Sequence, residues 1–171
     1  MAIIKSLRGF TPEFGKNCYL TETCVIVGDV KTGDDCTIWF NAIVRGDVNS
    51  IRIGNGVNIQ DGAIIHCNYK DSVSIIGDNV SIGHNAIVHG ATIEEGVLIG
   101  MGAIVMDHAL IKKNSVIAAG ALITKHTIIE AGSVYAGVPA KKIKGYKPED
   151  LGRMTLRSAE NYKMYREWYK K

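Results

Sequence analysis

Three of the five histidines in this 171-residue chain, His66, His84 and His89, lie close together in the sequence. Neutral imidazole nitrogens are common ligands for zinc and related divalent metals, so such a cluster suggests a metal site. Seventeen residues separate the first two histidines, and four separate the second two. Four intervening residues would give a poor ligand pair on an α-helix, so the meaning of this spacing depends on the local structure.

The histidines lie within a six-residue repeat of aliphatic side chains, most of which follow a small or aliphatic residue two positions earlier. In a strand, positions i and i−2 face the same side, so both enter the core, while glycine and polar residues between them allow a turn. Three six-residue sides make one coil of a triangular prism, and stacked coils bury their aliphatic rows on one another. The recurring aliphatic residues are Ile53, Ile59, Ile65, Ile76, Ile82, Val88, Ile93, Ile99, Val105, Ile111, Ile117, Ile123 and Ile129.

This hexapeptide pattern resembles that of the left-handed parallel β-helix family over about residues 15–140. The left hand is implied by the resemblance. We therefore expect an all-β solenoid over residues 1–140, followed by a linker and an amphipathic α-helix over 141–171. Breaks in the period predict loops that leave the prism near residues 47–50 and 68–71, a kind of segment that often carries function.

The predicted C-terminal helix begins at Pro148, because proline suits the first helical position and the acidic residues that follow suit the first turn. Its apolar residues recur at helical spacing, so we expect it to pack along the prism or against a neighbouring subunit. An aromatic platform for nucleotides is the alternative. The residues of this face are Leu151, Met154, Tyr162, Tyr165, Trp168 and Tyr169, with the small Ser158 between them.

Counting sides of the prism places Arg45, His66 and His89 in one outward-facing column on successive coils. Adjacent strands lie ~4.8 Å apart, so the two histidines can reach one metal ion. His84 follows the preceding side, roughly 16 Å along the chain from His89. It could join the same ion from a neighbouring chain, and a three-fold assembly would then have three equivalent interface sites, each with a position left for water.

The other two histidines and the cysteine beside His66 are not expected to bind the metal. His108 and His126 lack stacked partners in this count and are expected to be surface residues outside the metal site. Cys67 follows His66, and strand alternation points it toward the core.

Composition excludes several classes of function. The net charge is +3, and residues 141–171 carry 10 Lys and Arg against 4 Asp and Glu. No nucleic-acid-binding motif accompanies this charge, so we expect a solvated helix face and no nucleic-acid partner. No apolar run approaches the ~18 residues of a membrane span, the N-terminus has no signal-peptide pattern, and the four cysteines lack C-x-x-C spacing. We expect a cytoplasmic protein with reduced thiols and no membrane contact.

The motifs around the histidines resemble those of the γ-class carbonic anhydrases. This resemblance implies a homotrimer that binds zinc, or iron or cobalt, between subunits, through His66 and His89 of one chain and His84 of its neighbour. It implies the reversible hydration of carbon dioxide to bicarbonate, in which the metal lowers the pKa of a bound water toward ~7. The shared segments are 45–47 (Arg-Gly-Asp), 58–62 (Asn-Ile-Gln-Asp-Gly), His66, the His84-x4-His89 pair and 135–140 (Tyr-Ala-Gly-Val-Pro-Ala).

The resemblance also implies roles for residues around the metal. Gln60 matches a glutamine that orients the hydroxide or the substrate, although a polar corner residue would fit the same position. Arg45 and Asp61 match a charged pair that ties subunits together near the site. In the helix, Asn161 or Tyr162 stands where relatives place an asparagine or tyrosine near the metal.

This chain departs from the best-known family pattern at the residues that move protons. A glutamate directly after Arg-x-Asp is replaced by Val48, and the loop after His66 is short and lacks glutamates. The preceding Asp47 matches an acidic interface residue of the family, although an aspartate that caps its own turn would fit the same position. Without these glutamates, water or buffer must regenerate the hydroxide, which slows the reaction. Two other functions therefore remain open. One is an acyltransferase that uses acyl-CoA and an interface histidine as general base, and the other is a metal-bearing scaffold subunit with little turnover.

Overall fold

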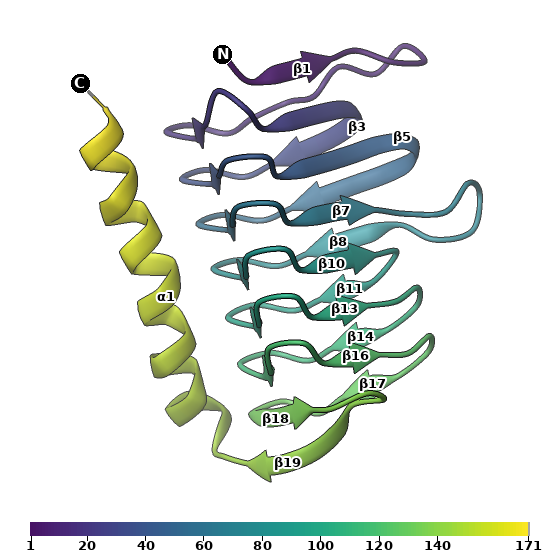
Figure 1. The fold of residues 1–171 in the computed structure, drawn as a ribbon, viewed down its shortest axis with the longest axis vertical. Coiled ribbons are helices and arrows are strands. Elements are labelled where there is room, and N and C mark those ends of the chain that lie inside the picture. Colours follow the sequence, from purple (N-terminus) through teal and green to yellow (C-terminus); the bar gives the residue numbers. More distant parts are fainter. Residues whose placement is uncertain (171) are drawn as a thin grey trace.

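The computed structural model of the protein describes residues 1–170. Over this range the chain forms nineteen strands and one α-helix. The strands wind into a left-handed parallel β-helix of stacked triangular coils, and the helix lies alongside them (Figure 1). The predicted fold class is therefore confirmed.

The prism has three faces, two of which are joined into one sheet because β3 and β5 bend from one face onto the next. The first face holds the initial parts of β3 (Val25–Thr32) and β5 (Ile43–Ile53), then β7 (Ile64–His66), β10 (Ile87–His89), β13 (Ile104–Val105) and β16 (Leu122–Ile123), and β1 (Ile3–Lys5) pairs with β3 at its edge. The second face holds the later parts of β3 and β5, then β8 (Ser74–Ile76), β11 (Thr92–Ile93), β14 (Leu110–Ile111) and β17 (Ile128–Ile129).

The third face is a separate sheet that lies beside the helix. Its order from the N-terminal end is β2, β4, β6, β9, β12, β15, β18 and β19. All pairs are parallel except the last, in which β19 runs antiparallel to β18. The strands are β2 (Tyr19–Leu20), β4 (Thr37–Ile38), β6 (Asn58–Ile59), β9 (Ser81–Ile82), β12 (Leu98–Ile99), β15 (Val116–Ile117), β18 (Ser133–Ala136) and β19 (Lys141–Gly145).

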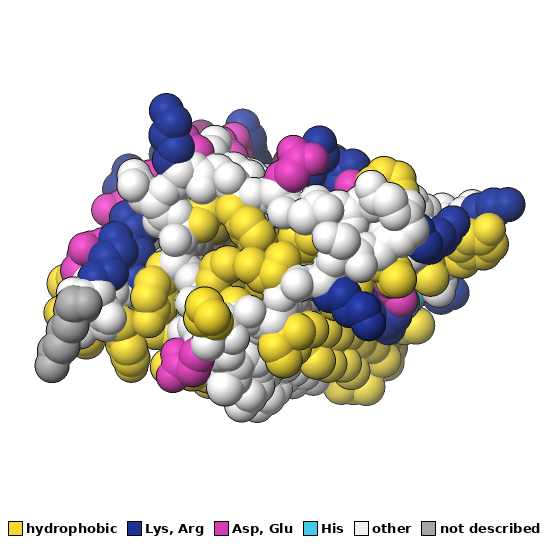
Figure 2. Space-filling view, turned by 90° about the horizontal axis from the view of Figure 1, so that it is seen from above, with side chains coloured by type: hydrophobic (Ala, Val, Ile, Leu, Met, Phe, Trp, Pro, Cys, Tyr) yellow, Lys and Arg dark blue, Asp and Glu magenta, His cyan; other side chains and the backbone are white. Residues whose placement is uncertain are grey.

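The core is the stack of aliphatic rows that the repeat predicts. Each of the thirteen aliphatic residues named for the repeat is at most 5% exposed. Successive coils are in register, so that Ile65 pairs with Val88 and Val88 with Val105. At the N-terminal end of the prism, where no further coil is added, apolar side chains remain visible in the middle of the surface (Figure 2).

Two details of the predicted chain path differ from the structure. The extra residues predicted near 47–50 form no separate loop: β5 spans them, and they bulge out of the pairing with β3, in which Gly28 pairs with Gly46 and Val30 with Ile51. The loop after β7 is confirmed and projects from the prism (Figure 1). The segment expected to be only a linker contains β19, which pairs with the backbone of the last coil and covers that edge.

Helix α1 (Pro148–Tyr169) begins at the predicted residue and runs back along the third face. Its apolar face is predicted only in part, since Met154 is 67% and Trp168 63% exposed. The buried positions include Thr155 and Ala159, because the helix lies close to the turns of the prism and only small side chains fit there. No helix within residues 1–170 is long and apolar enough to cross a membrane.

Candidate metal centre and adjoining cleft

His66 and His89 form the predicted stacked pair at the end of the first face. They are direct register partners on β7 and β10. Their rings are tilted against each other with centroids 5.1 Å apart, and Nδ1 of His66 lies 3.1 Å from Nε2 of His89. The alternation of the strands that places Ile65 and Val88 in the core therefore points one nitrogen of each ring toward a common position.

The outer nitrogen of each ring contacts a carboxylate. Nε2 of His66 is 3.0 Å from Oδ1 of Asp47, and Nδ1 of His89 is 2.9 Å from Oδ1 of Asp107. A neutral ring that donates its single hydrogen to a carboxylate carries a lone pair on the other nitrogen. The two inner nitrogens then present lone pairs to each other, and this arrangement favours a cation between them.

The inner nitrogens also have the spacing that a metal requires. Two nitrogens bound to one tetrahedral zinc at ~2.0–2.1 Å lie roughly 3.3 Å apart. The observed separation of 3.1 Å is close to this value. Carboxylates that fix the tautomer and orientation of metal-binding histidines are typical of zinc sites. The donor set of His66 and His89 therefore fits a divalent metal.

The charges around the pair keep it suitable for a cation. Burial lowers the pKa of His66, and the positive charge of Arg45 acts in the same direction against the raising effect of Asp47, so this ring is neutral near pH 7. Burial alone would raise the pKa of Asp47, but hydrogen bonds from His66 and Arg45 outweigh it and lower that pKa. The carboxylate therefore remains charged and can accept the imidazole hydrogen.

Asp107 is a site residue that the sequence reasoning missed. Its side chain is 5% exposed, and its Oδ1 accepts hydrogen bonds from Ser72 and Asn68 of the loop after β7 as well as facing His89. Burial would raise its pKa, but the hydrogen bonds from Ser72 and His89 lower it. Gly90 explains how it reaches the site. A Cβ at this position would lie 2.4 Å from Oδ1 of Asp107, and φ is +58°. In the sequence, the glycine directly after His89 is the signal that another side chain approaches closely at this point.

His84 lies on another part of the prism, in the turn after β9 on the third face. Its Nδ1 is 2.9 Å from Oδ2 of Asp61, and its Nε2 is 3.4 Å from the Tyr162 hydroxyl of the helix. Within residues 1–170 of one chain, no group of three His, Cys, Asp or Glu side chains is placed to hold a metal ion. His84 is thus apart from the stacked pair, as the side count predicts.

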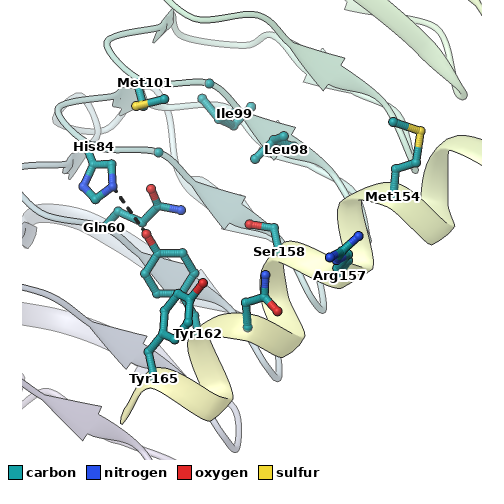
Figure 3. Close-up of a pocket in the computed structure, with 13 residues that line it drawn as sticks. Gln60, His84, Leu98, Ile99, Met101, Met154, Arg157, Ser158, Tyr162 and Tyr165 are labelled. Carbon is teal, nitrogen blue, oxygen red and sulfur yellow. Dashed lines mark hydrogen bonds between the residues drawn. The ribbon is translucent and has the colours of Figure 1, made fainter. Parts of the chain in front are cut away.

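A cleft of about 470 Å³ opens between α1 and the third face beside His84 (Figure 3). Gln60 enters it from β6 and is 5% exposed, with its Nε2 donating to Oδ1 of Asn58 at 2.9 Å. Asn161 and Tyr162 line the opposite wall. Burial, with the negative charge of Asp61, raises the pKa of Tyr162 to about 12, so its hydroxyl is neutral and can donate a hydrogen bond. The structure therefore brings Gln60, His84 and both helix residues together.

The two members of the expected charged pair have other partners within the chain. Arg45 forms an ion pair with Asp47, and Asp61 contacts His84. The carboxylate of Asp47 therefore joins Arg45 to His66. The side chains of Arg45 and Asp61 remain 44% and 42% exposed, so both can still contact a neighbouring subunit. A pair between these two residues stays a prediction for the assembly.

The prediction that His108 and His126 lack stacked partners is wrong. The two rings stack on each other with centroids 4.9 Å apart and planes 5° from parallel. The count missed this because both residues lie in turns, at left-handed corner positions with φ near +60°, and only the strand positions were counted. Cys67 is fully buried in the core, as alternation predicts.

Comparisons with known proteins agree with the fold. Residues 90–125 match the model of the bacterial transferase hexapeptide family, a stretch of six repeats. A probable carbonic anhydrase of Methanocaldococcus jannaschii is 52% identical over 136 residues, which cover 80% of this chain and 85% of the relative. Gamma carbonic anhydrase 2 of Arabidopsis mitochondria is 37% identical, with 89% of this chain and 56% of that protein covered.

The chain belongs to the γ-class carbonic anhydrase family. The carbonic anhydrases of this class are lyases. A hexapeptide transferase family protein of Anaplasma phagocytophilum has the same fold, with a TM-score of 0.90, 36% identity and 98% of each chain covered. Within this γ-class chain, Val48 is partly buried against the core beside Asp47, so no acidic group replaces the absent glutamate at that position.

Proposed function

We propose that the protein is a homotrimeric, metal-dependent carbonic anhydrase that reversibly hydrates carbon dioxide to bicarbonate. Each subunit interface would bind one Zn²⁺, or alternatively Fe²⁺ or Co²⁺, through His66 and His89 of one chain and His84 of the next. The observation that carries this proposal is the 3.1 Å approach of two ring nitrogens whose outer partners are carboxylates. The carbonic anhydrase names of the relatives support the reaction.

A divalent metal bound by these histidines acidifies a coordinated water, so that hydroxide is available near neutral pH. The chain holds its three rings in the tautomer that such binding needs. Asp47 and Asp107 accept the outer hydrogens of His66 and His89, and Asp61 does the same for Nδ1 of His84. This leaves the lone pair of His84 on Nε2, which lies 3.4 Å from the Tyr162 hydroxyl at the edge of the cleft.

Gln60 and the helix residues would shape the substrate side of the centre. Gln60 is fixed because one of its amide hydrogens is donated to Asn58, so its amide can orient water or bicarbonate in the cleft. The neutral hydroxyl of Tyr162 can donate a hydrogen bond in the same space, next to His84. Asn161 adds a second amide to this wall. The arrangement offers polar groups for bicarbonate and leaves apolar surface from Leu98 and Met101 for carbon dioxide.

Metal analysis and stopped-flow hydration of carbon dioxide test the proposal in one preparation. We expect about one metal ion per subunit and a rate that falls to the uncatalysed level after chelation. Because Val48 replaces a proton-carrying glutamate, the rate should rise with the concentration of added imidazole buffer. The proposal would be refuted if protein purified aerobically and protein purified anaerobically both bind no metal and do not hydrate carbon dioxide.

Acyl transfer is the second candidate, because the matched repeat family and the Anaplasma protein both carry transferase names. An acyltransferase needs one histidine as general base and no metal. Transfer or hydrolysis of acetyl-CoA by metal-free protein would favour it. Bound metal without hydration would instead favour a scaffold subunit with little turnover. The cytoplasmic location stays a prediction, supported by four free thiols.

A further inference from the structure

Two cysteines are stacked at the N-terminal end of the prism, outside the proposed metal centre. Cys18 and Cys36 directly precede β2 and β4, which pair in parallel. The backbone N–H of Tyr19 donates to the carbonyl of Cys36 at 2.8 Å, so the two cysteines occupy matching positions on neighbouring coils. Neighbouring strands place such α-carbons ~4.8 Å apart, within the ~4.4–6.8 Å range of a disulfide.

The two thiols differ in access to solvent. Cys36 is 1% exposed, because further coils cover it on the side toward the C-terminus. Cys18 is only half-buried, since β2 is the last strand of its sheet. Figure 2 shows this end of the prism with core side chains open to the surface. A small solute can therefore approach Cys18 while Cys36 stays behind it.

The two thiols also differ in pKa because of their surroundings. The neighbouring side chain of Cys36 is the largest influence on Cys18, and together with Thr32 it lowers the pKa of Cys18 to about 6 against the effect of burial. The same interaction, together with burial, raises the pKa of Cys36. Cys24 and Cys67 are buried in the core, and burial raises the pKa of both thiols. The pKa of Cys18 therefore lies below those of the other three thiols, which favours Cys18 as the attacking group.

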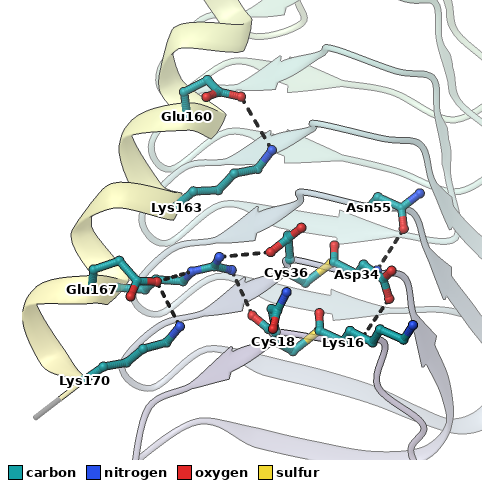
Figure 4. Close-up of polar contacts among 12 residues, drawn as sticks. Lys16, Cys18, Asp34, Cys36, Asn55, Glu160, Lys163, Glu167 and Lys170 are labelled. Atoms are coloured by element: carbon teal, nitrogen blue, oxygen red, sulfur yellow. Dashed lines mark hydrogen bonds and ion pairs between the residues drawn. The ribbon is translucent and has the colours of Figure 1, made fainter.

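Helix α1 fixes the two coils relative to each other at this point. Arg166 donates through Nη1 to the carbonyl of Asn17 at 2.8 Å and through Nη2 to Oδ1 of Asp35 at 2.9 Å. Asn17 and Asp35 are the corner residues directly before the two cysteines, and Figure 4 shows the side chains of Cys36 and Cys18 one above the other on neighbouring coils. These two contacts of Arg166 hold the two thiols in a constant arrangement.

We propose that Cys18 and Cys36 form a reversible oxidation site for hydroperoxides. The Cys18 thiolate attacks one peroxide oxygen, the O–O bond breaks, and the products are a sulfenic acid and hydroxide. The Cys36 thiol then attacks the sulfenic sulfur, which forms the disulfide and releases water. The peroxide is reduced by two electrons and the two thiols are oxidised by two electrons. A thiol reductant reverses the reaction.

The test treats the full-length protein at pH 7 with one equivalent of hydrogen peroxide, denatures it and blocks remaining thiols with iodoacetamide. The intact mass should show two blocked cysteines after peroxide and four after peroxide followed by dithiothreitol. Trypsin should yield residues 17–31 linked to residues 32–45. Cys18 and Cys24 share the first peptide, so the bond must persist in Cys24→Ala and be absent from Cys18→Ser.

Two further measurements test whether Cys18 reacts with the peroxide before Cys36 forms the disulfide. Cys36→Ser should stop at the sulfenic acid, which dimedone traps on Cys18. In untreated native protein, iodoacetamide should modify Cys18 roughly tenfold faster at pH 7 than Cys24 or Cys67, and this comparison needs no substitution. Four blocked cysteines after peroxide, a linked peptide pair in Cys18→Ser, or equal alkylation rates for the three thiols would overturn the proposal.

Discussion

Two pairs of histidines stack on neighbouring coils of this β-helix, and only one pair is arranged for metal binding. His66 and His89 lie at strand ends, with tilted rings and ring nitrogens 3.1 Å apart. His108 and His126 lie at turn corners, with rings 5° from parallel. Lone pairs of imidazole lie in the ring plane, so rings in parallel planes cannot direct them at one point, whereas tilted rings can.

The surrounding carboxylates strengthen this difference. His66 and His89 each face a carboxylate that is mostly buried, with exposed fractions of 20% for Asp47 and 5% for Asp107. His108 faces Asp71, which is 56% exposed and belongs to the projecting loop. A buried carboxylate fixes one tautomer, while an exposed contact is weakened by water. A repeat can therefore stack histidines at several positions, but metal binding also requires ring tilt and a fixed second partner.

Removal of either strand-end histidine should have the largest effect. His66→Ala and His89→Ala should lose bound metal and reduce carbon dioxide hydration by at least about a hundredfold, because two ligands no longer remain in one chain. Elemental analysis and stopped-flow assays give both values. His108→Ala is the matched control and should keep both near the wild-type values. A variant of His108 that loses metal would remove the distinction between the two pairs.

Neutralisation of the buried carboxylate should have an intermediate effect. Asp107→Asn keeps the size of the side chain but can present its amide hydrogens to His89, so metal affinity should fall about 10–100-fold. Competition with a fluorescent chelator measures this affinity. Asp71→Asn changes the partner of His108 and should leave the affinity unchanged. Equal losses in the two variants would contradict the assigned role of Asp107.

In the metal-free protein, the free energy of unfolding at acid pH should also depend on the Asp107 carboxylate. The pKa of Asp107 is lowered in the folded state, so its contribution to stability is present above the unfolded pKa of about 3.9 and is lost as the pH falls through the lower folded value. Urea unfolding followed by tryptophan fluorescence should therefore show a steeper loss below about pH 4 in wild type than in Asp107→Asn. Identical slopes would mean that Asp107 gains nothing from its partners.

The smallest effect is expected at the corner pair. His126→Ala removes one ring of an exposed stack, so the free energy of unfolding should change by less than about 1 kcal/mol, and metal content should not change. The same urea titration at pH 7 provides the value. A loss of several kcal/mol would show that the corner stack has a structural role that its exposure does not indicate.

The sequence predicts most of the fold because the core depends on a strict local period. Ile65, Val88 and Val105 are equivalent by count, and the structure pairs them in register. The count fails where the chain leaves the period. Residues 47–50 of β5 bulge out of the pairing with β3, and β19 forms only because the last coil offers a free edge. The extra residues of β5 interrupt the hexapeptide period, but neither their strand conformation nor β19 can be predicted from that period.

The candidate site is predictable only in part for the same reason. His66 and His89 follow from the period, since both come one residue after a core position. Asp107 contacts His89 of the neighbouring coil, lies next to Gly90 and accepts hydrogen bonds from the loop after β7. Such a contact depends on three segments that meet only in the folded chain. Helix contacts are likewise set by tertiary packing, so Tyr162 beside His84 could be suggested by resemblance but not by spacing.

Subunit mixing tests most directly whether the site is shared between chains. His84→Ala and His66→Ala proteins, each without metal, are unfolded together, mixed in equal amounts and refolded. About one quarter of the interfaces should then combine an intact pair with an intact His84 and regain metal and hydration. A mixture of His66→Ala and His89→Ala should regain none, because no chain keeps both ligands. Recovery in this control, or no recovery in the first mixture, would contradict the shared centre.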